Sequence, residues 1–260
     1  MNRDGNRRVE NKRLIYYQKT ADDQHWENLW ERTMDSKFFE PFIKGNLSPF
    51  EQVFTKYLPK QGLILEAGCG TGQWVIALQA RHYPCIGVDY AIKALLSASK
   101  ISPMPVFGGD LLNLGLATAC VDAVISLGVV EHRQAGPEPF LVELTRVLKP
   151  GGLLLISVPY FHPLRLWRAA HGAYQDIVDG LDFYQQAFTR EEFSQIVTDQ
   201  GYDILDWATI EHRKGLRQEL PWMTRIGSLP SRILFKLTDF APYIRKNLGH
   251  MLLLVGQKKK

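Results

Sequence analysis

The feature that most constrains this chain is a glycine-rich turn that follows a short apolar run. Residues 63–72 read LILEAGCGTG, with glycines at Gly68, Gly70 and Gly72. Glycine has no side chain, so the backbone amides of such a turn can approach a ligand closely. The run 73–80, QWVIALQA, then predicts a helix whose N-terminus faces that ligand. The sequence therefore predicts a strand, a nucleotide-binding turn and a helix.

The spacing of these glycines argues against a nicotinamide cofactor. The dinucleotide fingerprint Gly-x-Gly-x-x-Gly would want a small residue where Gln73 stands. The next apolar run, residues 85–90, contains Asp89, which lies 21 residues after Gly68. A carboxylate at that position can accept hydrogen bonds from both hydroxyls of a ribose, so adenosine is the predicted ligand group.

Two further apolar runs end beside the same predicted site. Residues 104–110 place Asp110 at their carboxyl end, where it can accept a hydrogen bond from an adenine amino group. Residues 122–127 stop at Gly128. Because ligands of open α/β sheets bind outside the carboxyl ends of strands, these strand ends are expected to converge on one pocket.

Five segments, taken in order, resemble successive motifs of class I S-adenosylmethionine-dependent methyltransferases, and within them of the type-11 group. They are Glu66–Gly72, Gly87–Asp89, Gly109–Asp110, Val129–His132 and Arg146–Gly152, and the resemblance covers residues 47 to 211. It implies S-adenosyl-L-methionine as the cofactor. The cofactor contacts that it implies are Glu66, Gly68, Cys69, Gly70, Asp89, Tyr90, Asp110, Leu111 and Leu127.

Short strands and helices alternate between residues 50 and 159, which predicts parallel strands joined by right-handed crossovers. With 260 residues and 45% hydrophobic content, one domain is the economical interpretation. The resemblance implies an α/β fold with a doubly wound, mostly parallel seven-stranded sheet, helices on both faces and an antiparallel last strand. Residues 47–260 are predicted to form this Rossmann-like methyltransferase domain.

The first 46 residues are predicted as a polar tail followed by an aromatic lid helix. Residues 1–13 are polar, whereas Trp26 and Trp30 lie four residues apart on one helical face. Two interpretations stay open for that helix: it packs on the core sheet, or it closes over the cofactor. Under the second interpretation, Tyr16 and Tyr17 are candidate cofactor contacts.

An aromatic insertion at residues 160–188 interrupts the alternation of strands and helices. Its place above the carboxyl ends of the strands predicts a substrate pocket, with Tyr160, His162 and Tyr184 as lining residues. His132 follows the fourth strand and is the candidate catalytic base, because histidine titrates near neutral pH. The alternative is that His132 only shapes the pocket.

A metal ion is not predicted. Metal-assisted O-methyltransferases resemble this region with a Glu-x-x-Glu-His cluster, but here residues 128–132 read GVVEH. The first acid is missing, and two adjacent ligands make a poor divalent site. The Asp/Asn-Pro-Pro-Tyr motif of amine methyltransferases that act on nucleic acids is also missing, which removes the main support for base methylation.

Residues 212–249 form a second insertion, and it is basic and amphipathic. Eight basic residues stand there against two acidic ones, whereas the whole chain has a net charge of +4. Apolar residues recur at three- and four-residue steps from Ile226 to Ile244, although Pro230 and Pro242 limit helix length. Three interpretations stay open: a cap packed on the domain, a contact with an anionic membrane, or a nucleic-acid patch. Nucleic acid is disfavoured, because no zinc, helix-turn-helix or RNA-recognition motif accompanies the charge.

The chain is expected in the cytoplasm, with a membrane surface as a candidate peripheral location. No apolar run approaches the roughly 18 to 20 residues that a membrane helix requires, and the first residues do not read as a secretory signal. Cys69, Cys85 and Cys120 fall in or beside predicted strands, so reduced thiols are expected. The sequence leaves the oligomeric state open.

The resemblance and the aromatic insertion together predict methyl transfer to a small, hydrophobic acceptor. Oxygen is the favoured acceptor atom, with carbon or nitrogen as alternatives. A rival enzyme would methylate RNA or protein and bind it through residues 212–249. A rival outside enzymes is a regulatory protein that binds the cofactor without turnover, but the intact set of Asp89, Asp110, Glu131 and His132 argues against it. Fold analogy alone selects no acceptor.

Overall fold

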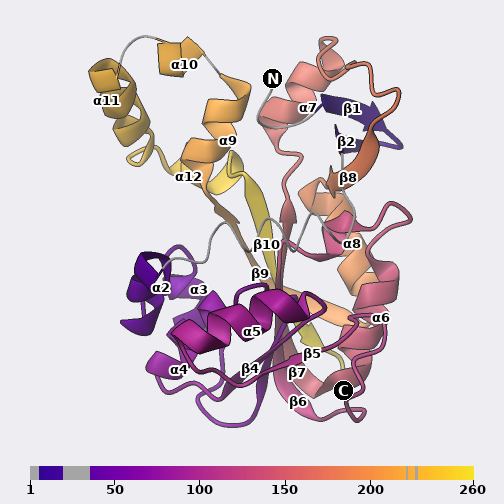
Figure 1. The fold of residues 1–260 in the computed structure, drawn as a ribbon. Coiled ribbons are helices and arrows are strands. Elements are labelled where there is room, and N and C mark those ends of the chain that lie inside the picture. Colours follow the sequence, from indigo (N-terminus) through magenta and orange to yellow (C-terminus); the bar gives the residue numbers. More distant parts are fainter. Residues whose placement is uncertain (1–5, 20–35, 221, 226–227) are drawn as a thin grey trace.

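The computed structural model describes residues 6–19, 36–220, 222–225 and 228–260. Two sheets organise these residues: a seven-stranded central sheet and a three-stranded sheet above it (Figure 1). Helices cover both faces of the central sheet, so the chain forms the doubly wound α/β layers that its sequence predicts.

The central sheet confirms the predicted topology. Its pairs from β5 to β7 are parallel, whereas β10 is antiparallel to both of its neighbours. The carboxyl ends of the parallel strands therefore meet at one edge, which we call the carboxyl edge. The strand order is β5 (Val106–Gly108), β4 (Cys85–Asp89), β3 (Ile64–Ala67), β6 (Val121–Leu127), β7 (Leu148–Pro159), β10 (Met251–Lys258) and β9 (Tyr202–Ile210).

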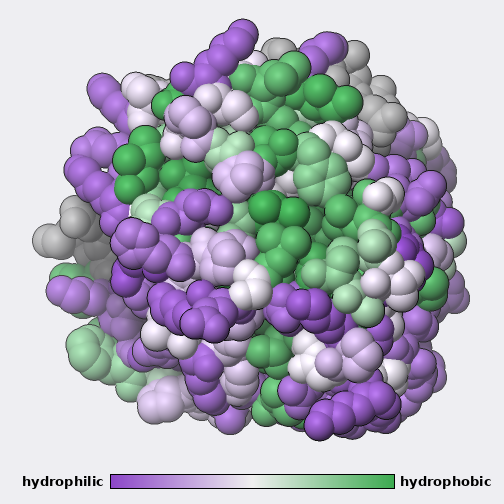
Figure 2. All heavy atoms as spheres, turned by 90° about the horizontal axis from the view of Figure 1, so that it is seen from below, coloured by the Kyte–Doolittle hydropathy of each residue, from purple (hydrophilic) through white to green (hydrophobic). Residues whose placement is uncertain are grey.

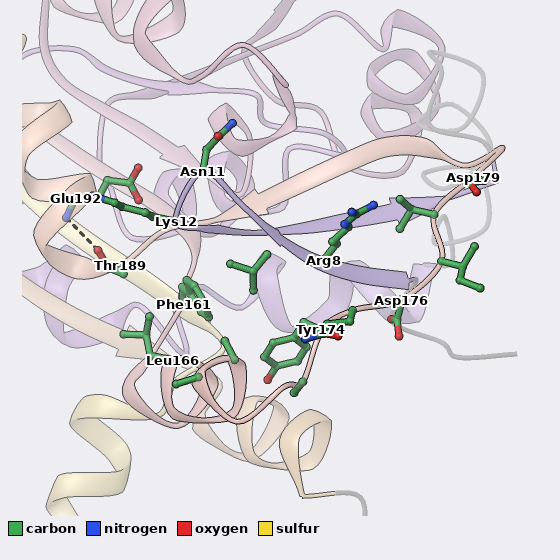
Figure 3. A pocket seen from close by; sticks show the side chains of 17 residues that line it. Arg8, Asn11, Lys12, Phe161, Leu166, Tyr174, Asp176, Asp179, Thr189 and Glu192 are labelled. Carbon is green, nitrogen blue, oxygen red and sulfur yellow. Dashed lines mark hydrogen bonds between the residues drawn. The ribbon is translucent and has the colours of Figure 1, made fainter.

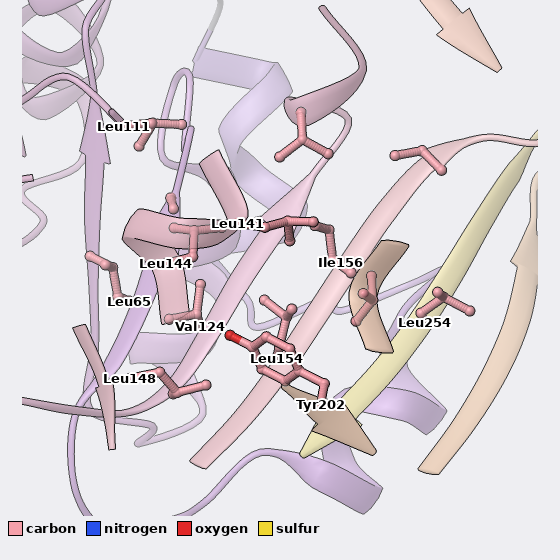
Figure 4. Close-up of a cluster of buried hydrophobic side chains, with 14 of the residues drawn as sticks. Leu65, Leu111, Val124, Leu141, Leu144, Leu148, Leu154, Ile156, Tyr202 and Leu254 are labelled. Atoms are coloured by element: carbon pink, nitrogen blue, oxygen red, sulfur yellow. The ribbon is translucent and has the colours of Figure 1, made fainter. Parts of the chain in front are cut away.

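Two helix layers enclose the sheet. Helices α6 and α8 pack on one face, and part of the hydrophobic cluster between them and the strands is drawn in Figure 4. Helices α3, α4 and α5 pack on the other face, and α2 packs on α4. The bounds are α2 (Ser36–Ile43), α3 (Glu51–Tyr57), α4 (Gln73–Ala80), α5 (Ile92–Ile101), α6 (Glu138–Val147) and α8 (Arg190–Asp199).

Strand β7, an interior strand of the seven-stranded sheet, shows how its sequence fits this position. Leu154, Ile156 and Val158 point into one hydrophobic layer, and Leu155 points into the other. All four side chains are fully buried. Because both faces of the strand are covered, it reads in the sequence as a continuous apolar run rather than as an alternating one.

The N-terminal residues form a hairpin, so the prediction of a polar tail is wrong for this part of the chain. Strand β1 (Asn6–Glu10) pairs antiparallel with β2 (Arg13–Gln18), which pairs in turn with β8 (Asp182–Ala187). The sequence of β1 looks polar because its inward-facing Arg7 finds its ionic partner 212 residues further along the chain. Trp26 and Trp30, the predicted lid residues, lie outside the described residues.

The two predicted insertions rise on opposite sides of the carboxyl edge (Figure 1). One side, which we call the hairpin lobe, contains β1, β2, β8 and α7 (Pro163–Ala170). The other side, which we call the basic lobe, contains α9 (His212–Glu219), α10 (Trp222–Arg225), α11 (Ser228–Thr238) and α12 (Pro242–Asn247).

The end of the molecule away from these lobes has a different surface. Viewed from there, apolar side chains gather near the centre of the face, inside a largely hydrophilic rim (Figure 2). A search of the helices, restricted to their described residues, finds none that is both long enough and apolar enough to span a membrane.

Candidate active site

The glycine turn lies where the sequence predicts it, between β3 and α4. Gly68, Gly70 and Gly72 have positive φ angles of 81°, 55° and 71°, which glycine adopts without strain. Gly68 is also closely approached, because a Cβ atom built on it would lie 2.5 Å from Cγ2 of Val129. Since α4 begins at Gln73, the turn presents the amides of a helix N-terminus to a ligand.

Asp89 braces this turn from the end of β4. Its Oδ2 accepts a hydrogen bond from the Gly70 amide at 2.7 Å, and its Oδ1 accepts one from the Ala91 amide at 2.9 Å. Burial raises the pKa of Asp89, while the bonds from Ala91 and Gly70 oppose that rise. Each carboxylate oxygen has a further lone pair, so the predicted bonds to ribose hydroxyls remain open to it.

Glu66 brings a buried carboxyl group to the same end of β3. It is 3% exposed, and its Oε2 has no hydrogen-bond partner among the described residues. Burial raises the pKa of Glu66 well above its usual range, and the nearby Asp89 charge adds to the rise. A buried polar atom without a partner is costly, so this carboxyl is suited to a donor supplied by a ligand.

The other predicted cofactor contacts follow the same edge. Cys69 is buried within the turn, whereas Tyr90 is 46% exposed just after β4. Asp110 and the buried Leu111 come directly after β5, and Leu127 ends β6. The sheet order places β5, β4, β3 and β6 side by side, so these residues border one continuous stretch of the carboxyl edge.

His132, the predicted base, ends the 3-10 helix η1 (Val130–His132), which follows β6. Its Nδ1 lies 2.7 Å from the carbonyl oxygen of Tyr184 in β8. A carbonyl oxygen only accepts hydrogen bonds, so Nδ1 carries the proton and Nε2 of the neutral ring carries the lone pair. The rings of His132 and Tyr184 have centroids 5.0 Å apart. The structure therefore brings two predicted site residues together and selects the tautomer that a base at Nε2 needs.

Glu131 adds a second proton-binding group beside His132. Its Oε1 lies 3.9 Å from Nε2 of His132, and its Oε2 has no partner in the described part of the chain. Glu131 is 1% exposed, and burial raises its pKa to about 8. Gly128 lies close to this carboxyl, because a Cβ atom there would be 3.6 Å from Oε1. Sequence reasoning singled out Glu131 only as part of a motif, since its burial is a property of the fold.

Tyr160 and His162 form the second predicted pair, with ring centroids 5.9 Å apart. His162 caps α7, where its Nδ1 accepts a hydrogen bond from the Arg165 amide at 3.3 Å. Burial and the Arg165 charge lower the pKa of His162 to about 3, so the ring is neutral near pH 7 with its proton on Nε2. Within the described ranges Nε2 has no partner. His162 is therefore a buried hydrogen-bond donor rather than a base.

A buried ion cluster joins the two lobes, and the sequence analysis missed it. The Glu219 carboxylate, from α9, accepts from Arg7 at 2.8 Å, from Arg165 at 2.9 Å and from Arg168 at 2.6 Å, and also from the Tyr174 hydroxyl. Burial alone would raise the pKa of Glu219, but the charges of Arg165 and Arg7 lower it to about 2. We call these five residues the Glu219 cluster. One signal was present in the sequence, because Glu219 is one of only two acids in the basic insertion.

A cavity of about 1180 Å³ lies in the hairpin lobe (Figure 3). Its walls come from β1 and the turn after it, from α7 and from the segment around Tyr174. Phe161 and Leu166 contribute apolar surface, and Arg8 and Lys12 contribute charge. None of the predicted cofactor or substrate residues lines this cavity, so it is separate from the candidate active site.

Metal ligands were also sought in the described ranges. No three His, Cys, Asp or Glu side chains gather there in a way that could hold a metal ion. Glu131 and His132 are adjacent, but Gly128 occupies the position where the metal-assisted enzymes carry a further acid.

Comparisons with known proteins agree with this geometry. Residues 65–156 match the family model described as "Methyltransferase domain". A protein of Encephalitozoon cuniculi that is named "Putative methyltransferase" is 29% identical over 167 residues, which cover 60% of this chain and 77% of that protein. A probable S-adenosylmethionine-dependent methyltransferase of Mycolicibacterium smegmatis is 30% identical over 158 residues, which cover 60% of this chain but only 57% of that protein.

Two other similar proteins are a relative that is named as a tRNA methyltransferase and a methyltransferase solved in complex with an activator protein. The Arabidopsis thaliana tRNA (carboxymethyluridine(34)-5-O)-methyltransferase is 32% identical over 112 residues, which cover 42% of this chain and 27% of that protein. A solved methyltransferase complex with the Trm112 methyltransferase activator of Haloferax volcanii shares the fold, with a TM-score of 0.62 at 17% identity, and the match covers 91% of this chain and 97% of that one.

The fold and the carboxyl-edge site define an α/β enzyme that binds a nucleoside cofactor. The family match and the relatives narrow this further: residues 65–156 match a methyltransferase domain, and the findings together support a class I S-adenosylmethionine-dependent methyltransferase. Its residues fit S-adenosyl-L-methionine, since the glycine turn leaves backbone amides open to a ligand and Oε2 of the buried Glu66 carboxyl, which has no partner among the described residues, suits a ligand ammonium group. The sequence-based predictions of family, fold, enzyme class and cofactor are confirmed.

Proposed function

We propose that the protein transfers the methyl group to an oxygen atom of a small acceptor with an apolar body, with carbon and nitrogen as alternative acceptor atoms. The arrangement of His132 carries this proposal. The Tyr184 carbonyl holds the proton on Nδ1, so Nε2 is the basic atom beside the carboxyl edge. Tyr160 and Tyr184 add aromatic walls, which suit an apolar acceptor.

The proposed mechanism assigns a task to each of these residues. S-adenosylmethionine supplies, when bound, an electrophilic methyl group on a positively charged sulfur atom. An acceptor hydroxyl loses its proton to Nε2 of His132 as its oxygen takes up the methyl group. Glu131, 3.9 Å from that nitrogen, stabilises the imidazolium when its carboxyl group, whose pKa is raised to about 8, is ionised. The buried ring of Tyr160 helps to exclude water from the reacting atoms.

The test is a methyl-transfer assay with radiolabelled S-adenosylmethionine against a panel of phenols, quinols, carboxylic acids, transfer RNA and unfolded protein. Label in an organic-soluble product supports the proposal. The variant His132→Ala should lower turnover by about 10²–10⁴-fold, the usual contribution of a general base, without changing affinity for S-adenosylmethionine. Undiminished turnover of that variant with every acceptor would remove His132 from the mechanism.

RNA is the second candidate acceptor. The Arabidopsis thaliana relative is named as a tRNA methyltransferase, and the basic lobe carries cations that could contact phosphates. The match spans only 27% of that relative, which leaves most of its length without a counterpart in this comparison. Label in transfer RNA, with binding that weakens steeply as salt rises, would favour this candidate over the small acceptor.

We also propose that the protein works in the cytoplasm and touches a membrane surface from there. Cys69 and Cys85 are buried free thiols, which suits a reducing compartment. Fractionation of cells that express the full chain tests this location. Recovery in a periplasmic or secreted fraction would contradict it.

A further inference from the structure

The basic lobe has an inner face that packs on the domain. Leu216, Met223 and Phe235 are buried together, and Leu164 of α7 packs against them. The Thr209 hydroxyl also donates a hydrogen bond of 2.6 Å to the carbonyl of Arg245. The lobe is therefore a cap, as one interpretation of the sequence expected, but this packing uses only part of its apolar surface.

The outer face of α11 and α12 exposes large apolar side chains. Ile233 is 53% exposed, Leu237 is 58% exposed and Phe240 is 78% exposed, and their spacing of four and three residues places them on one side of the helix and its C-terminal end. Tyr243 at the start of α12 is 66% exposed. Large apolar side chains that are exposed at such short spacing mark a candidate interaction surface. We call these four residues the outer stripe.

The charges beside the outer stripe are basic. Lys236, Arg245 and Lys246 are exposed on the same two helices. The one acid in this stretch, Asp239, is paired with Arg213 and accepts a contact from His212, whose Nε2 lies 2.9 Å from Oδ1. An apolar stripe flanked by cations, with its acid already paired, has the composition of an interfacial helix that binds an anionic bilayer.

We propose that the outer stripe and its flanking cations dock the protein on a bilayer that contains anionic lipids. The stripe enters the boundary between headgroups and acyl chains, and Lys236, Arg245 and Lys246 contact lipid phosphates. An RNA backbone would use the cations but leaves aliphatic side chains such as Ile233 and Leu237 without a partner. The inference rests on the proposed function, since it names the surface from which an apolar acceptor would be drawn.

The experiment is co-sedimentation of the full chain with vesicles, without cofactor or acceptor. Wild-type protein should sediment with vesicles of phosphatidylcholine mixed with phosphatidylglycerol, and far less with phosphatidylcholine alone. The double variant Leu237→Glu, Phe240→Glu should lose this binding, whereas Leu96→Glu, which changes a 61% exposed side chain on α5, should keep it. Lys236→Gln should weaken binding by about fivefold, the usual contribution of one basic residue near an anionic surface.

Three results would overturn the proposal: no sedimentation of the wild type with either vesicle, equal sedimentation of the double variant, or binding to transfer RNA in place of vesicles. Affinity of each variant for S-adenosylmethionine, measured by calorimetry, shows whether the domain remains folded. Because vesicle binding needs no turnover, its failure is distinct from a failure of the methyl-transfer assay. Vesicle binding without any organic-soluble product would support the outer stripe as a membrane-docking surface and contradict the proposed small apolar acceptor.

Discussion

The two halves of the carboxyl edge are built in different ways. In the cofactor half, Asp89 bonds to Gly70, only 19 residues away, and both belong to one strand-turn-helix-strand unit. In the acceptor half, Glu219 holds Arg7, which lies 212 residues away, and Arg165, which lies 54 residues away. The cofactor half is thus fixed by local backbone geometry, and the acceptor half by charges from remote segments.

This difference decides which property of the protein a substitution in each half will alter. Backbone amides and glycine conformations leave few alternatives for a turn that must approach a nucleoside. The lobes of the acceptor half, by contrast, depend on one buried carboxylate that serves three guanidinium groups. We therefore expect substitutions in the acceptor half to lower mainly the free energy of unfolding. Substitutions in the cofactor half should lower mainly the affinity for S-adenosylmethionine.

The largest expected effect comes from Glu219→Gln. The change leaves the buried charges of Arg7 and Arg165 without a carboxylate, which should lower the free energy of unfolding by about 3–5 kcal/mol. Urea denaturation measures this loss. The control is Glu211→Gln, whose carboxylate is 45% exposed in a surface pair with Lys214, and which should cost at most about 1 kcal/mol. Equal losses in the two variants would mean that the cluster does not hold the lobes together.

The same cluster gives stability a dependence on pH. The pKa of Glu219 is lowered to about 2 in the folded chain, below the value of about 4.3 that glutamate has in an unfolded chain. The folded state therefore binds fewer protons at this site, so the contribution is complete above the unfolded value and is lost as pH falls through the folded one. In Glu219→Gln this part of the acid-induced loss should disappear.

A smaller effect, and one of a different kind, is expected for Asp89→Asn. The amide can accept only one of the two backbone hydrogen bonds from Gly70 and Ala91, so the turn loses one of these bonds, and the predicted bonds to the ribose hydroxyls lose an anionic acceptor. Affinity for S-adenosylmethionine should fall by about 1.5–3 kcal/mol, the usual contribution of hydrogen bonds to a charged group. Calorimetric titration with the cofactor and with S-adenosylhomocysteine measures it.

Two further variants test whether the cofactor half and the acceptor half are independent of each other. Asp203→Asn removes a carboxylate that is 67% exposed on β9 and should leave affinity unchanged. Glu219→Gln should also keep its affinity for the cofactor while the protein is folded, because the Glu219 cluster belongs to the acceptor half. A loss of cofactor affinity in Glu219→Gln comparable to that in Asp89→Asn would show that the two halves are not separate.

The sequence predicted the strand, turn and helix of the cofactor half but not the Glu219 cluster of the acceptor half, for the same physical reason. The short spacing of Gly68, Gly70 and Asp89 in the sequence already predicts the turn and its carboxylate. The alternation of strands and helices then places these residues at one edge of the sheet. The hairpin that contains Arg7 gave no such signal, because the burial of an arginine depends on an acid from a distant helix. The raised pKa of Glu131 is equally invisible in the sequence, since burial produces it.

Glu131 lies between the two halves, and Glu131→Gln is expected to have the smallest effect. The pKa of Glu131 is about 8 in the folded chain, above the unfolded value of about 4.3. Between these values the folded state binds more protons than the unfolded state, so the contribution of this residue to stability falls as pH rises. The glutamine variant does not titrate. Its stability relative to wild type should therefore increase by at most about 1.4 kcal/mol from about pH 6 to about pH 7.

Turnover of the same variant shows whether this acid also takes part in the reaction. If the carboxylate supports His132, wild-type turnover should rise as pH approaches about 8 and Glu131 ionises. In Glu131→Gln the rise should be absent, with KM for the cofactor unchanged, because Glu66 and Asp89 remain in place. A variant that keeps the wild-type pH profile would show that Glu131 takes no part in the reaction and only fills space beside Gly128.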